Sequence, residues 1–169
     1  MNYSRGGLDV TCNGRSYRFP KSPTVVVCID GSEPGYIERA IEKGLAPNMA
    51  RMMKDGANLL AHSVIPSFTN PNNMSIITGR PPAVHGIAGN YFYDPATRTE
   101  VMMNDAKFLR APTIMQAFHD AGAKVAVVTA KDKLRTMLGK GLDMSSGRAI
   151  AFSSEKADKA NVKEHGIGD

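Results

Sequence analysis

Alternating and continuous runs of apolar residues divide the sequence into expected strands and helices. Between Asp9 and Phe19, apolar and polar residues alternate around Asn13-Gly14. This dipeptide readily adopts the positive φ angles of a two-residue turn, so we expect a short β-hairpin. The run Thr24–Ile29 is almost continuously apolar and β-branched, which is typical of a strand covered on both faces of a parallel sheet. A second strand is expected at Asn58–Val64.

Helical patterns and further strands alternate along the rest of the chain. Three helices should end before a glycine, and we expect them at Tyr36–Lys43, Pro47–Lys54 and Pro112–Ala121. Asn70 as N-cap with Pro71 at the first helical position predicts another helix, which places Thr69 at a helix mouth. The remaining expected elements are a surface hairpin (Tyr91–Tyr93 with Glu100–Met103), strands at Lys124–Thr129 and Ala149–Phe152, and helices at Lys131–Leu138 and Ser154–His165.

The repeated β-α-β-α order predicts an α/β fold with a doubly wound, mostly parallel sheet flanked by helices. We expect residues 1–22 to form the hairpin and its lead-in, and residues 23–169 to form the α/β part. Ligands of such folds bind outside the carboxyl ends of the strands. Asp30, Thr69 and Lys131 all follow expected strands, so they are candidate site residues.

Composition places the 169-residue chain among globular proteins, with 42% apolar and 22% charged residues, which excludes disorder and collagen. No apolar stretch approaches the roughly 20 residues that cross a bilayer, so we expect no membrane association. The N-terminus lacks the apolar core of a secretory signal, and a cytoplasmic location is therefore the default expectation. Two cysteines are too few for a disulfide framework.

The formal net charge of +5 raises the question of nucleic-acid binding. Basic residues are spread along the chain beside acidic ones, as in Lys131-Asp132-Lys133, and no RNA-binding aromatic signature occurs. We therefore expect no nucleic-acid partner and interpret the positive charge as suited to a small anionic substrate. The oligomeric state is left open, with a homodimer as one hypothesis.

Two residues invite chemistry from their positions alone. The carboxylate of Asp30 stands where a strand should end and could meet a metal, or could cap the following turn. The hydroxyl of Thr69 stands beside the free N–H groups of a helix, whose positive field stabilises an alkoxide or a phosphoryl group. Thr69 could equally be a capping threonine.

The segment from Ile65 to Asn90, IPSFTNPNNMSIITGRPPAVHGIAGN, carries a denser signal. It resembles the nucleophile segment of the alkaline phosphatase superfamily, especially its nucleotide pyrophosphatase/phosphodiesterase branch. The matching positions are Pro66, Thr69, Pro71-Asn72, Thr78-Gly79, Pro82, His85-Gly86-Ile87 and Asn90. Within that superfamily the chain looks most like the phosphonoacetate hydrolases, from about Asp9 to Ile167.

This resemblance implies roles for particular residues. Asp30 and Thr69 would bind one of two zinc ions, with Thr69 also the nucleophile. Asn90 would contact the phosphonate oxygens, while Lys131 and Lys133 would hold the other end of phosphonoacetate. The two lysines also suit the chemistry itself, because breaking a C–P bond expels a carbanion whose delocalised charge needs compensation. By spacing alone, they could simply be the solvated first turn of a helix.

The resemblance also implies zinc ligands that this sequence does not contain. Two catalytic zinc ions need about six protein ligands, and this chain supplies two. The family's other ligands, an Asp and a His four residues apart, an Asp-His pair and a late His, have no counterpart here. The histidines show no metal-binding spacing, and we expect His85 to support its loop. We therefore interpret the chain as the N-terminal portion of such an enzyme, expected to be inactive alone.

Three functions remain as hypotheses. The first is hydrolysis of phosphonoacetate to acetate and phosphate through a zinc-activated Thr69. The second is a nucleotide pyrophosphatase/phosphodiesterase activity, which Lys131 and Lys133 disfavour because they suit a small, doubly anionic substrate. The third is a catalytically inactive, truncated α/β module.

Overall fold

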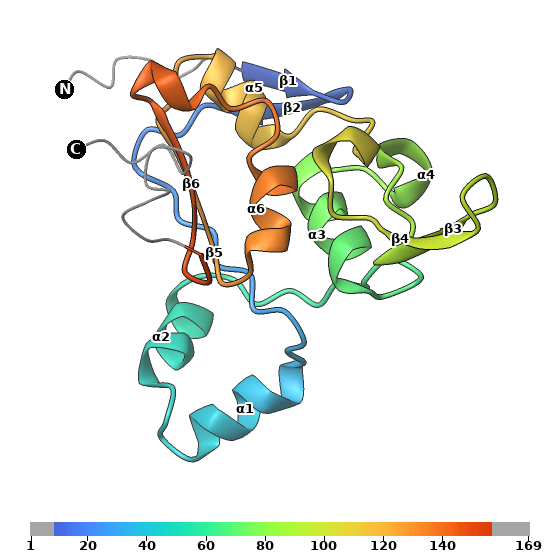
Figure 1. The fold of residues 1–169 in the computed structure, drawn as a ribbon. Helices are drawn as coiled ribbons and strands as arrows, with labels where there is room; N and C mark the ends of the chain where they lie inside the picture. The colour runs from blue at the N-terminus through green and yellow to red at the C-terminus, as the bar shows by residue number, and fades with distance from the viewer. Residues whose placement is uncertain (1–8, 157–169) are drawn as a thin grey trace. The chain divides into compact units, whose positions relative to one another are not determined.

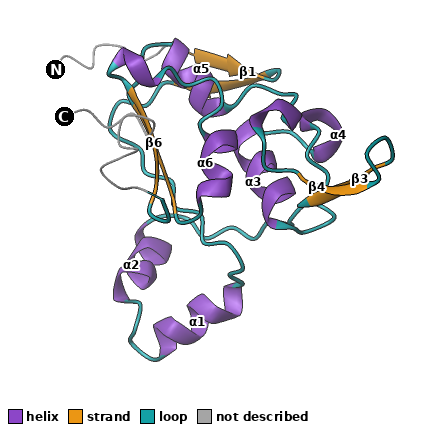
Figure 2. Cartoon of the chain, viewed as in Figure 1, coloured by secondary structure: helices purple, strands orange, loops and turns teal. Residues whose placement is uncertain are grey.

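The computed structural model describes residues 9–156, which form a mixed α/β structure (Figures 1 and 2). The chain divides into two compact units. Among the described residues, the first unit comprises 9–24 and 64–156, and the second comprises 25–63. The expected helix at Ser154–His165 lies almost entirely outside the described residues.

The N-terminal hairpin forms as expected from strands β1 (Asp9–Cys12) and β2 (Arg15–Arg18), paired antiparallel. Its turn has positive φ at both central residues, 50° at Asn13 and 71° at Gly14. Phe118 of helix α5 (Ile114–Asp120) meets the ring of Phe19 edge to face at 5.8 Å. The hairpin therefore has an apolar contact in the first unit and is more than a surface turn.

The segment that carries the resemblance folds into two helices and leads into a hairpin. Helix α3 (Thr69–Thr78) ends at Gly79, whose φ of 64° suits a glycine cap. Helix α4 (Pro82–His85) follows, and then strands β3 (Tyr91–Asp94) and β4 (Thr99–Met102) pair antiparallel. The expectation that Asn70 caps α3 is wrong, because the helix begins one residue earlier and Phe68 occupies the N-cap position without a side-chain bond.

A parallel β-α-β arrangement follows α5. Strand β5 (Val125–Thr129) and strand β6 (Ala149–Ser153) pair in parallel, with helix α6 (Asp132–Leu138) between them in the chain. Two short 3-10 helices, η1 (Ala106–Phe108) and η2 (Met144–Ser146), complete the first unit. Its core joins α3 and α6 with the chain between them through Met74, Ile77, Ile87, Met103, Leu109, Leu134 and Met137. Figure 1 shows these two helices side by side.

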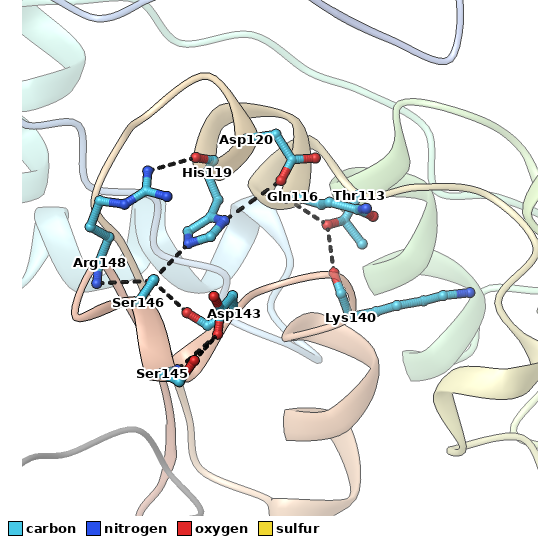
Figure 3. A network of polar contacts seen from close by, with 9 residues as sticks. All are labelled: Thr113, Gln116, His119, Asp120, Lys140, Asp143, Ser145, Ser146 and Arg148. Carbon is cyan, nitrogen blue, oxygen red and sulfur yellow. Dashed lines mark hydrogen bonds and ion pairs between the residues drawn. The ribbon is translucent and has the colours of Figure 1, made fainter.

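A polar network ties the C-terminal end of α5 to the turn that precedes β6 (Figure 3). The Oγ of Ser146 donates to the carbonyl of Asp143 at 2.6 Å, so it accepts a hydrogen bond from Nε2 of His119 at 3.2 Å. The guanidinium of Arg148 in turn donates to the carbonyl of His119 at 3.0 Å. The buried imidazole therefore fixes the start of β6 against α5.

The second unit contains helices α1 (Pro34–Glu42) and α2 (Pro47–Asp55), close to the two expected there. The strands expected at Thr24–Ile29 and Asn58–Val64 are wrong for this structure, since both segments are extended chain without ladder pairing (Figure 2). Val25 is 83% exposed and Leu59 is 86% exposed. A β-branched run becomes a strand only when another strand pairs with its backbone and apolar groups cover its faces.

Candidate functional site

Thr69 is the first residue of α3 and is half-buried. The first four N–H groups of a helix have no partner within it, and they create a positive field at this end. Phe68, at the N-cap, contributes no side-chain bond to these groups. The hydroxyl of Thr69 therefore stands at a helix mouth, as the sequence predicts, in a setting suited to a developing negative charge.

The side chain of Asn90 lies at the same end of α3. Its Oδ1 accepts a hydrogen bond from the backbone N–H of Asn70 at 3.0 Å, so an amide from the loop before β3 caps the helix. Because only the oxygen of an amide can accept this bond, the orientation of the Asn90 side chain is fixed. Within residues 9–156, no acceptor takes a hydrogen bond from its Nδ2. That NH₂ group is therefore left to donate to a further acceptor.

His85 braces the loop that leads to Asn90. Its Nδ1 accepts the backbone N–H of Ile87 at 3.1 Å, so Nε2 carries the proton and donates to Oγ of Ser75, 2.9 Å away. Burial lowers the pKa of His85, and the positive charge of Arg110 lowers it further. A neutral, fully buried imidazole with both nitrogens engaged is a structural brace, in agreement with the expectation from the sequence.

Lys131 and Lys133 lie together where β5 passes into α6, and both are exposed. They line an open hollow of about 410 Å³ at the carboxyl ends of β5 and β6. Its remaining lining residues are Asn104, Asp132, Thr136, Glu155 and Lys156. In the part of the chain that the structure describes, no carboxylate lies within ion-pair distance of the Nζ of either lysine. The two ammonium groups can therefore receive an anion.

The two acidic residues of this hollow are engaged with other groups. Oδ1 of Asp132 accepts hydrogen bonds from Nε of Arg135 at 2.7 Å and from Oγ of Ser153 at 2.8 Å. Both bonds lower the pKa of Asp132, and the bond with Arg135 has the larger effect. Oε2 of Glu155 accepts the backbone N–H of Asp132 at 2.7 Å. The sequence does not predict this anchoring; its only local signal is the Asp132 and Arg135 pair, three residues apart on a helix.

One short segment joins the threonine end of the site to the lysine end. The backbone N–H of Met103 donates to the carbonyl of Asn90 at 2.8 Å, and the carbonyl of Met103 accepts Nδ2 of Asn70 at 2.7 Å. The next residue, Asn104, lines the lysine hollow, and its carbonyl accepts Oγ1 of Thr136 at 3.2 Å. Four of the five residues expected in the site thus belong to one connected arrangement within the first unit.

Asp30 belongs to the second unit, where it lies in an exposed turn that follows extended chain. The strand that was expected to carry it is absent there. A catalytic zinc ordinarily takes three protein ligands, and residues 9–156 contain no group of three or more His, Cys, Asp or Glu placed to bind one metal ion. The described residues therefore do not by themselves fit a zinc centre, and zinc binding by Asp30 and Thr69 stays a prediction.

Residues 24–148 match the family model described as type I phosphodiesterase / nucleotide pyrophosphatase. The chain belongs to this family. An uncharacterized pyrophosphatase/phosphodiesterase from Schizosaccharomyces pombe is 29% identical over 119 residues, which are 69% of this chain and 22% of that protein. An ectonucleotide pyrophosphatase/phosphodiesterase of Caenorhabditis elegans is 34% identical over 107 residues, covering 59% of this chain and 14% of the relative.

Among solved structures, this type I phosphodiesterase family chain is similar to the phosphonoacetate hydrolase of Sinorhizobium meliloti 1021, in complexes with phosphonoformate and with phosphonoacetate. In each case the identity is 66% and the TM-score is 0.89. The match covers 95% of this chain and 39% of that hydrolase. The chain therefore spans well under half the length of the relatives it matches. Across residues 9–156, no helix is both long and apolar enough to span a membrane.

Proposed function

We propose that this chain carries the substrate-binding part of a phosphonoacetate hydrolase, which cleaves phosphonoacetate into acetate and phosphate. The observation that carries the proposal is the Met103–Asn104 segment, which connects Asn70 and Asn90 to the lysine hollow. One end of the arrangement offers a hydroxyl and an amide to a phosphonate, and the other end offers two ammonium groups to a carboxylate. The 66% identity to a phosphonoacetate hydrolase supports the same substrate.

The proposed reaction has two steps. Thr69 Oγ gives up its proton to solvent and attacks phosphorus, the C–P bond breaks, and its electron pair passes to carbon, where the adjacent carboxylate delocalises the charge as an enediolate. Protonation of that carbon gives acetate, and water then hydrolyses the phosphothreonine to release phosphate. The amide of Asn90 donates to a phosphoryl oxygen, and Lys131 and Lys133 stabilise the charge of the enediolate.

A nucleotide pyrophosphatase/phosphodiesterase activity is the second candidate, because the family model and the curated relatives carry that description. The same Thr69 and Asn90 end would serve any phosphoryl group. The lysine hollow favours the first candidate, since two adjacent ammonium groups suit a small second anion better than a nucleobase.

The test uses a chimera in which this chain is continued by the remaining sequence of the Sinorhizobium meliloti hydrolase. In it, Thr69→Ala should reduce phosphate release from phosphonoacetate at least about 10²-fold, because the nucleophile is lost. Ser67→Ala, which removes an exposed hydroxyl two residues away, is the matched control and should retain activity. Activity of Thr69→Ala within threefold of the parent chimera would reduce Thr69 to a structural residue.

A further inference from the structure

Asn70 is the side chain of the threonine end that bonds directly to the Met103–Asn104 segment. It is 2% exposed, and its Nδ2 donates to the carbonyl of Met103 at 2.7 Å. The acceptor is a carbonyl, so the nitrogen of the amide must face it, and the orientation of the side chain is settled. Its Oδ1 is buried without a hydrogen-bond partner in the described structure.

A buried amide oxygen without a partner destabilises the folded state, because it has lost its hydrogen bonds to water. An apolar residue of similar size would avoid that loss. The role of the Asn70 side chain must therefore lie in the hydrogen bond of its Nδ2. That bond holds the peptide unit that links Met103 to Asn104.

The backbone of the same residue acts on the other partner. The N–H of Asn70 has no partner within α3, because it belongs to the first turn, and its hydrogen bond goes to Oδ1 of Asn90. The N–H of Met103 then donates to the carbonyl of Asn90, which closes a cycle of three hydrogen bonds among Asn70, Asn90 and Met103. The cycle holds Asn90 at its side chain and at its main chain.

We propose that Asn70 is a positioning residue that sets the distance between the phosphonate end and the carboxylate end of the site. Through its N–H it orients the amide of Asn90, and through its Nδ2 it fixes the peptide unit that leads into Asn104 and the lysine hollow. A ligand that bridges both ends depends on this distance, whereas a ligand that occupies one end does not. This inference rests on the proposed function for its ligand and on the hydrogen-bond cycle for its geometry.

The first test needs no ligand. Hydrogen exchange of the full chain reports the backbone N–H of residues 70 and 103 separately. Asn70→Ala keeps its own N–H, yet both groups should exchange at least about tenfold faster, because the cycle loses the bond that holds Met103. Asn90→Ala should accelerate exchange at residue 70 alone, since residue 103 still has the main-chain carbonyl of residue 90 as acceptor.

Thr113→Ala is the control for general destabilisation, because it removes a fully buried cap of α5 that has no bond to the cycle. It should leave exchange at residues 70 and 103 unchanged relative to the rest of α3. If Asn70→Ala does not fold, Asn70→Asp is measured instead, since it keeps the size but replaces the donor with an oxygen. Unchanged exchange at residue 103 in the folded variant would overturn the proposal.

The second test compares two ligands on the same full chain by NMR titration. Phosphonoacetate can bridge both ends, whereas methylphosphonate lacks the carboxylate. Asn70→Ala should weaken phosphonoacetate at least about fivefold more than methylphosphonate, and Thr113→Ala should weaken neither. Equal weakening of both ligands would overturn the proposal. If the unsubstituted chain binds neither ligand, the proposed function of the isolated chain is contradicted, and the exchange experiment alone decides the role of Asn70.

Discussion

Under the proposed function, Asn90 serves both folding and binding with one side chain. Its amide oxygen caps α3 by accepting the N–H of Asn70, and this bond fixes which atom of the amide is oxygen and which is the NH₂ group. An aspartate at this position could make the cap but could not donate to an anion. The demand for an acceptor on one side and a donor on the other is met by an amide alone among side chains of this length.

The side chains of Lys131 and Lys133 should control which substrate is turned over. In the chimera, Lys131→Ala or Lys133→Ala should reduce turnover of phosphonoacetate at least about tenfold more than turnover of p-nitrophenyl phosphate, because only the former has a carboxylate to be held. Steady-state kinetics on both substrates measure the ratio. Lys124→Ala removes an exposed lysine before β5 and is the control. Equal losses on the two substrates would assign the lysines to the phosphoryl group or to folding.

Between elements, the carboxylate of Asp132 connects the first turn of α6 to the end of β6. It bonds Arg135 on its own helix and Ser153 on the strand, and its side chain is 16% exposed. Oε2 of Glu155, just beyond β6, accepts the N–H of Asp132. The turn that presents the lysines is therefore anchored by one carboxylate on α6 and one just beyond β6.

These hydrogen bonds of Asp132 predict that the stability of the fold depends on pH. The folded state lowers the pKa of Asp132, so its contribution to stability is present above the unfolded value of about 3.9 and is lost as the pH falls through the lower, folded value. At pH 7, Asp132→Asn should reduce the free energy of unfolding by about 1–3 kcal/mol, and the difference from the parent should shrink below about pH 4. Urea unfolding at several pH values measures this difference.

The control for this prediction is Asp55→Asn, an exposed carboxylate at the end of α2. It should change the free energy of unfolding by less than about 0.5 kcal/mol at any pH. If the free energies of unfolding of Asp132→Asn and the parent differ by the same amount down to pH 3, the charge of the carboxylate is not what stabilises the contact between α6 and β6.

Elements with local causes were predictable from the sequence. The hairpin at Asn13-Gly14 and the end of α3 at Gly79 depend on the conformations of single residues, and both form as expected. The strand expected at Thr24–Ile29 depends on partners elsewhere in the chain, which no local pattern reveals. The prediction that Asn70 caps α3 was wrong for the same reason, since Asn90 supplies the cap from twenty residues away.

The sequence predicts which residues make up the candidate site but not how they are arranged. The segment Ile65–Asn90 marked Thr69 and Asn90 through its resemblance to a family. Nothing in it indicated that Asn70 would bond to Met103, because that contact spans 33 residues and depends on how β4 ends. The role of Asn70 in holding Met103 therefore follows from the tertiary structure.

For the whole molecule, the expected zinc content follows from the number of ligands. Asp30 and Thr69 are two donors where a catalytic site takes three, and a threonine binds a metal poorly until its hydroxyl loses a proton. After dialysis against metal-free buffer, the isolated chain should retain less than one zinc ion per chain. Inductively coupled plasma mass spectrometry measures this content. Asp30→Ala should not change that content. Two zinc ions held by the unsubstituted chain would contradict the ligand count.

The lysine turn is built through its main chain, and this has a consequence for how substrate classes can diverge. The N–H and carbonyl of Lys131 both bond to Oγ1 of Thr129, and the N–H of Asp132 bonds to Glu155. The lysine side chains themselves extend into the hollow without supporting the turn. Different side chains could replace the two lysines while the turn stays folded. A descendant could therefore accept a substrate whose second group is not a carboxylate, with the Thr69 and Asn90 end of the site unchanged.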